Sequence, residues 1–180
     1  MKKILTSIMM IVLVCALIGT GVYAAFSDTE TSTGNQFTAG TLDLEVDTQN
    51  PWSTVKFDNV GPLAPGDSGA VTCAVKNVGN LPGTSLTVDI SGLVDAGELG
   101  ANMDIVIWDD VDGDAVQDAG ETTEMYNGTL AAEAGPYTVG SGLNAGVTTN
   151  VGISYSIDSG VGNEIQGDTC TFDIEFVLTQ

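Results

Sequence analysis

Apolar and polar residues alternate along most of this chain, a pattern that few folds can accommodate. Neighbouring side chains of a β-strand point to opposite faces, so a period of two is typical of a strand with one buried face. The more continuous apolar run at 103–108 is typical of a strand covered on both faces. The pattern predicts strands at residues 42–46, 54–58, 71–75, 86–90, 103–108, 151–157 and 170–178.

Turn signals separate these runs, and beyond the N-terminus no segment has sustained helical periodicity. Within residues 63–67, Pro65 and Gly66 suit the two central positions of a type II turn. At most a short helical turn is expected, near residues 130–134. Short strands joined by polar turns predict an all-β fold, a jelly-roll-like antiparallel β-sandwich.

The N-terminus has the layout of a secretory signal peptide. Lys2 and Lys3 precede an uncharged stretch from Ile4 to Ala25, whose strongly apolar part, residues 8–18, ends before a break at Gly19-Thr20-Gly21. Small residues at Val22 and Ala24 predict cleavage between Ala24 and Ala25 by a signal peptidase. The predicted signal peptide is therefore residues 1–24. The alternative is a retained membrane anchor.

Removal of residues 1–24 leaves 156 of 180 residues, enough for one domain with a real core, predicted at residues 37–180. Two lysines then face 24 carboxylates, a formal charge of −22. So negative a chain is a poor partner for nucleic acid or anionic lipid. Its self-repulsion calls for an offset such as salt, bound cations or a covalent brace.

One acidic stretch has the spacing of a calcium loop. Counted from Asp110, oxygen donors fall at positions one, three, five, nine and twelve, with a backbone carbonyl at position seven. Position six is Ala115 rather than glycine, and the preceding element is a strand, so the stretch is not an EF-hand. A solvated acidic turn is the alternative. The predicted ligands of a structural calcium ion are Asp110, Asp112, Asp114, Val116, Asp118 and Glu121.

Two cysteines remain after cleavage, Cys73 and Cys170, and an exported protein can join such a pair. Each shares the parity of the apolar residues in its predicted strand, so both side chains should point into the core. We expect a disulfide between them, which would stabilise the fold by about 4–5 kcal/mol through loop closure. Two separate buried thiols are the alternative.

Catalytic patterns are scarce. The chain has no histidine, which excludes histidine-based triads and the H-E-x-x-H zinc site. It has neither a Walker A sequence nor a dinucleotide fingerprint, so no small-molecule substrate is expected. We therefore expect a protein that is not an enzyme. Asn127-Gly128-Thr129 fits the pattern of an N-glycosylation acceptor at Asn127.

Residues 25–36 read as a strand without a sheet of its own. This stretch is rich in Ser and Thr and has one large apolar residue, Phe26. A frayed terminus is the alternative.

Several stretches together resemble one family: GVYAAFSDTETSTGNQFTAGTLDLEV, LAPGD, KNVGN and NEIQGDTCTFDIEFVLTQ. They are similar to the TasA and camelysin family of exported biofilm-fibre proteins, which includes archaeal bundling-pilus relatives. The resemblance implies a jelly-roll domain, processing by a dedicated signal peptidase, and polymerisation in which the freed N-terminal segment completes the sheet of the next subunit. Camelysins are also described as metalloproteases, an activity for which this chain has no recognisable zinc site.

The family's donor segment corresponds by position to residues 25–36, and the resemblance gives the unpaired segment a use. The residues expected to begin the donor strand are Ala25, Phe26, Ser27, Asp28, Thr29 and Glu30.

The leading hypothesis is a secreted subunit of an extracellular fibre or pilus in a biofilm matrix, a homopolymer built by strand addition, with Phe26 as the apolar anchor. The alternative is a monomeric, calcium-stabilised cell-surface or S-layer-associated domain. A secreted protease is a distant third.

Overall fold

The computed structural model describes residues 2–23, 30–58 and 60–180, which form two units, one ending at Thr38 and one spanning Ala39–Gln180. The first unit contains the helix α1 (Lys2–Tyr23). No helix in the described part of the chain combines the length and the apolar character that a membrane span requires.

The helix α1 continues through Gly19, Thr20 and Gly21, where the sequence predicted a break. Glycine keeps its backbone N–H and costs only about 1 kcal/mol relative to alanine in a helix, so it weakens the helical backbone without interrupting it. The predicted cleavage site, Ala24 and Ala25, lies outside the described residues.

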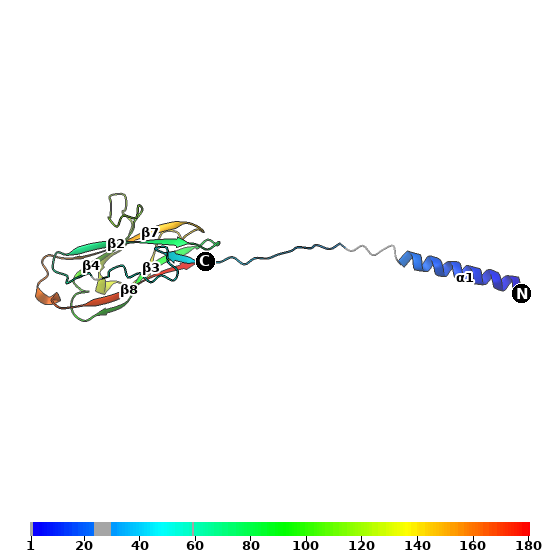
Figure 1. The fold of residues 1–180 in the computed structure, drawn as a ribbon, viewed down its shortest axis with the longest axis horizontal. Coiled ribbons are helices and arrows are strands. Elements are labelled where there is room, and N and C mark those ends of the chain that lie inside the picture. The colour runs from blue at the N-terminus through cyan, green and yellow to red at the C-terminus, as the bar shows by residue number, and fades with distance from the viewer. Residues whose placement is uncertain (1, 24–29, 59) are drawn as a thin grey trace. The chain divides into compact units, whose positions relative to one another are not determined.

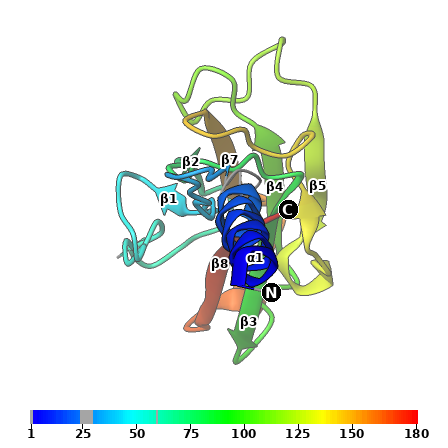
Figure 2. The same ribbon diagram turned by 90° about the vertical axis from the view of Figure 1, so that its right-hand side faces the viewer.

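The second unit is an antiparallel β-sandwich, which confirms the predicted all-β class (Figure 1). One sheet has the order β1-β2-β7-β4-β5 and the other β6-β3-β8. The strands are β1 (Leu44–Val46), β2 (Ser68–Asn77), β3 (Ser85–Asp95), β4 (Met103–Asp109), β5 (Glu124–Thr129), β6 (Tyr137–Thr138), β7 (Thr148–Ile157) and β8 (Cys170–Thr179). Figure 2 shows β1 and β5 at opposite edges of the larger sheet.

The core lies between the inward faces of the two sheets. Val75, Ile107 and Ile153 are fully buried on the larger sheet, and Leu86 and Val88 are fully buried on the smaller one. At about 25 cal/mol for each Å² of apolar surface removed from water, burial of this kind is the main source of stability. The core therefore rests on the alternation seen in the sequence.

The prediction and the structure differ mainly in the short elements. Residues 54–58 form no strand, although Phe57 packs against Phe172 and Tyr155. The 3₁₀ helix η1 (Leu130–Ala132) matches the expected helical turn, and a second, η2 (Asn163–Ile165), was not expected. β5 and β6 were missed because they are short and weakly alternating.

The turn at residues 64–67 has the predicted form. The N–H of Asp67 donates to the carbonyl oxygen of Ala64 at 3.0 Å, and Gly66 has a φ of 93°. A positive φ at the third position is the mark of a type II turn.

The two cysteines do not form the expected disulfide; both are free thiols. Their side chains do point inward as the parity indicated, from different sheets. Cys73 lies on β2 of the larger sheet and is completely buried, whereas Cys170 begins β8 of the smaller sheet and borders a cavity.

Burial raises the pKa of Cys73 to about 12 and also raises the pKa of Cys170. A pKa of about 12 instead of 9.0 lowers the thiolate fraction of Cys73 at pH 8 about 1,000-fold. In a Cys15→Ser background, we therefore expect Cys170 to react with a thiol reagent slowly and Cys73 essentially only after unfolding. Mass spectrometry after iodoacetamide treatment, with and without urea and without reductant, measures this. Recovery of linked Cys73 and Cys170 peptides would contradict the structure.

Candidate metal centre

The predicted metal ligands lie in the loop of residues 110–121, which joins β4 to β5. The loop begins beside the central strand β7, where the N–H of Asp110 donates to the carbonyl oxygen of Asn150 at 3.2 Å. Just before it, Trp108 pairs with Gly152 of β7, and a Cβ at position 152 would overlap the indole ring. Glycine at position 152 therefore makes room for the side chain that anchors the loop.

Glu121, at the twelfth position, is 5% exposed and accepts hydrogen bonds from four donors. Its Oε1 accepts from the N–H of Val111 at 2.6 Å and more weakly from that of Asp112 at 3.4 Å. Its Oε2 accepts from the indole Nε1–H of Trp108 at 3.2 Å and from the N–H of Asp118 at 3.3 Å. A buried carboxylate needs such donors, since burial without them costs several kcal/mol. Glu121 thus closes the loop through its hydrogen bonds.

Asp110 is fully buried and holds the first half of the loop. Its two carboxylate oxygens accept from the N–H groups of Gly113, at 2.8 Å, and Ala115, at 3.1 Å. Gly113 and Ala115 both have positive φ, 78° and 63°. Position six of the spacing, where calcium loops have glycine, therefore takes the left-handed conformation even though the residue is alanine.

Three of the predicted ligands come together. One carboxylate oxygen each from Asp110, Asp112 and Asp114 lie within 4.8 Å of one another. Desolvation and the neighbouring carboxylates of Asp114, Glu121 and Asp110 raise the pKa of Asp112. Such crowding of acids is a state that a cation would relieve.

The side chains of Asp118 and Glu121, the other predicted carboxylate ligands, lie outside this group. The backbone N–H groups of Val116 and Asp118 donate to Asp114 and Glu121 respectively, and Glu121 is engaged by the backbone. The structure therefore brings together three of the five predicted carboxylate ligands.

The chemistry of these donors suits a hard cation. Carboxylate oxygens are typical ligands of calcium, magnesium and manganese, whereas protein zinc sites draw mainly on histidine and cysteine. The chain has no histidine, and Cys73 and Cys170 belong to the sandwich core. This Asp-rich group could therefore hold a metal ion of the oxygen-preferring kind.

Two other predicted sites stand apart from the loop. Asn127 is exposed on the edge strand β5, where its side chain donates to Oε2 of Glu124 at 2.9 Å. Of the predicted donor-strand residues, only Glu30 is described, and it is exposed. Ala25, Phe26, Ser27, Asp28 and Thr29 lie outside the described residues.

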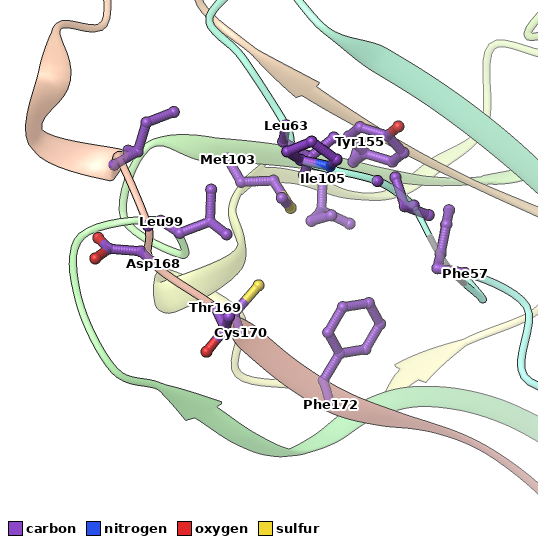
Figure 3. Close-up of a pocket in the computed structure, with 15 residues that line it drawn as sticks. Phe57, Leu63, Leu99, Met103, Ile105, Tyr155, Asp168, Thr169, Cys170 and Phe172 are labelled. Atoms are coloured by element: carbon purple, nitrogen blue, oxygen red, sulfur yellow. The ribbon is translucent and has the colours of Figure 1, made fainter.

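A cavity of about 470 Å³, which sequence reasoning missed, lies at one end of the sandwich (Figure 3). The side chains of Met103 and Ile105 point into it from the larger sheet and that of Phe172 from the smaller one. Phe57 and Leu63 border it from the segment that precedes β2. No short motif marks such a cavity, because its lining comes from distant parts of the chain.

Comparison with known proteins identifies a family for the chain. The sequence model of a family described as camelysin metallo-endopeptidase matches residues 1–106. No curated protein matches the chain.

Substitution of Glu121 tests the loop architecture. In Glu121→Gln, an NH₂ group replaces one carboxylate oxygen and leaves the N–H groups that donate to that oxygen without an acceptor. We therefore expect a loss of about 1–3 kcal/mol in the free energy of unfolding. Urea unfolding in EDTA measures this without a bound cation. The matched control is Glu124→Gln, an exposed carboxylate that accepts from Gln117 and Asn127 and should change stability by less than about 0.5 kcal/mol. Equal effects of the two substitutions would show that Glu121 does not organise the loop.

Proposed function

The chain belongs to the camelysin family, and we propose that it is an exported structural subunit of an extracellular fibre. In this proposal the N-terminal segment, residues 25–36, extends away from its own sandwich domain and adds as a strand to a sheet of the next subunit. The fibre is a homopolymer in the biofilm matrix or on the cell surface, and it needs no nucleic acid or small-molecule substrate.

The observation that carries the proposal is that the chain before β1 pairs with no strand among the described residues. Residues 30–43 belong to no helix or strand, and residues 30–41 are exposed throughout. Phe37 is fully exposed to solvent, an unusual position for a large apolar side chain. Within residues 32–35, the side chain of Asn35 bonds to Ser32 across a turn that an added strand would have to open.

Strand addition also explains why subunits would assemble only after export. Before cleavage, the segment is continuous with α1 and its approach to a partner is restricted. After cleavage each subunit can give one strand and receive one, a head-to-tail contact that need not close and so can propagate. Signal peptidase is then the enzyme that releases assembly.

Removal of the segment tests the proposal. Protein that begins at Ala25 should form fibres, whereas protein that begins at Phe37 should stay monomeric, as judged by electron microscopy and light scattering. Because the mature chain is strongly acidic, assembly should accelerate as salt rises from low ionic strength. Fibres that form equally well from both proteins would show that the segment is not the connector.

We further propose that the loop of residues 110–121 binds calcium, through Asp110, Asp112 and Asp114 and, after rearrangement, Glu121. Bound cation would offset the repulsion among these acids. By mass action, calcium at 100 times its Kd should stabilise the fold by about 2.7 kcal/mol and raise the Tm by several degrees.

Calorimetry of EDTA-treated protein in rising calcium measures this effect. Asp112→Asn should abolish the response, and Asp173→Asn, an exposed acid on β8, should retain it. A Tm that does not change up to millimolar calcium would overturn the calcium proposal and leave the fibre proposal standing.

The family description favours a second candidate, a metal-dependent endopeptidase. Its metal would have to be held by oxygen ligands, for which the Asp110 group is the best placed among the described residues. Casein hydrolysis that EDTA abolishes and Asp112→Asn removes would support this second function. If the assay shows no hydrolysis, the family's name is the sole support for an endopeptidase function.

A further inference from the structure

One long edge of the sandwich has no partner strand. β8 pairs only with β3, and its other edge is open among the described residues. Two hydrogen bonds fix which backbone groups point there: the N–H of Thr84 donates to Thr179, and the N–H of Ala96 donates to Thr169. Odd-numbered residues therefore face β3. The even-numbered residues direct their N–H and C=O groups to the open edge over ten residues of strand.

The same even-numbered residues form an incompletely covered part of the core. Cys170, Phe172, Ile174, Phe176 and Leu178 point inward, yet every one of them is only half-buried. On the neighbouring strand β3, Leu86 and Val88 are completely buried. The apolar row of β8 thus lies along a side of the sandwich that its own chain does not close.

Residues 52–57, named here the cover segment, lie against this row without pairing to it. Trp52 packs on Phe176 with ring centroids 5.8 Å apart, and Phe57 packs on Phe172 at 6.1 Å. Among the described residues, no backbone group of the cover segment bonds to β8. The Nε1–H of Trp52 is buried without an acceptor, a cost of about 1–3 kcal/mol.

The cover segment also leaves space beside β8. The cavity of Figure 3 lies on one side of the contact between Phe57 and Phe172, and a second cavity of about 450 Å³ lies between Trp52, Lys56 and residues 170–174. β8 therefore has an apolar row beside cavities and a row of backbone groups without hydrogen-bond partners, as expected where a sheet lacks its next strand.

We propose that the open edge of β8 is the acceptor for the N-terminal segment of a second copy, and that this added strand displaces the cover segment from β8. This inference rests on the proposed function and identifies where on the sandwich the strand binds. The cover segment keeps the apolar row from water while the subunit is alone.

The N-terminal segment suits this edge by its alternation. The odd-numbered residues from Ala25 to Phe37 carry no charge, and both acids, Asp28 and Glu30, are even-numbered. Extended by one residue to Phe37, the segment would as a strand present an uncharged face to the core, with Phe37 in place of Phe26 as its anchor, and to solvent a face that carries both acids and Phe26. β8 has the same arrangement, with Asp173 and Glu175 on its exposed face. Thirteen residues reach about 43 Å, enough to line a ten-residue strand.

A second copy suits the edge better than the chain's own segment. Thr41 bonds to Asn80 and Leu81, and Gly83 lies against Leu178, so the chain enters the sandwich at the end where β8 finishes. Its own preceding residues could reach the edge only parallel to β8. Every strand pair among residues 30–58 and 60–180 is antiparallel. The segment of another molecule is free to add in the antiparallel direction, the more stable pairing.

Hydrogen exchange tests the acceptor without a substitution. The full chain is expressed with export, and amide exchange is compared between secreted monomer and fibre, with residue resolution by NMR after the fibres are dissolved. The N–H groups of Phe172, Ile174 and Phe176 should exchange at least about 100-fold more slowly in the fibre. The edge strand β5 serves as the control and should change little. Fibres that form without this gain would overturn β8 as the acceptor while the proposed function stands; absence of fibres would overturn both.

Two further measurements separate the cover from the anchor. Subtraction of the Trp52→Phe fluorescence spectrum from that of the unmodified protein isolates Trp52, and its emission should shift when fibres form. Phe37→Ala should slow assembly at least about tenfold, whereas Phe26→Ala, the same change on the other face, should slow it less. A stronger effect of Phe26→Ala would overturn the assigned face, and an unchanged Trp52 spectrum would overturn displacement of the cover.

Discussion

The contact between Trp108 and Gly152 links the larger sheet of the sandwich to the acidic loop of residues 110–121. β7 is the centre of the larger sheet, paired with β2 on one side and β4 on the other. Its inward side chains, among them Val151 and Ile153, complete the core, while its outward Gly152 leaves space for the indole of Trp108. The indole N–H then donates to Glu121, which in turn holds the backbone of the acidic loop. A side chain at position 152 would displace the indole and with it the loop, because the sheet beneath is densely packed.

The strong negative charge explains why backbone donors matter so much here. With four basic residues against 24 acids, few carboxylates can form ion pairs; Asp47 and Lys56 form one, at 2.9 Å. The buried carboxylates Asp110 and Glu121 accept from main-chain N–H groups instead. Such bonds satisfy a charge without another side chain, but they leave its negative sign in place. The loop is therefore ordered and still electronegative, the condition in which a cation adds most.

The sequence predicts the core of this fold better than its edges. Alternation located β2, β3, β7 and β8, because burial of one face enforces a period of two, and the continuous apolar run at 103–108 located β4. It failed at residues 54–58, where the same period is present but no ladder forms, since pairing depends on a neighbour that sequence does not show. It also failed for Cys73 and Cys170, because parity gives the direction of a side chain and not which side chain lies opposite it. In the loop, spacing located the acids, but Glu121 is taken up by backbone donors that spacing cannot reveal.

The two edges beside the cover segment differ in how they are protected. The edge of β2 is partly closed by β1 and by Asp47, whose N–H and carboxylate both bond to Ala74. The edge of β8 has no such closure, and its exposed face carries Asp173 and Glu175. Like charges on an open edge oppose pairing between identical molecules, a common safeguard of exposed strands. Here the acids of the N-terminal segment would meet those of β8, so the same repulsion that keeps subunits apart at low ionic strength would weaken as salt or divalent cations screen it.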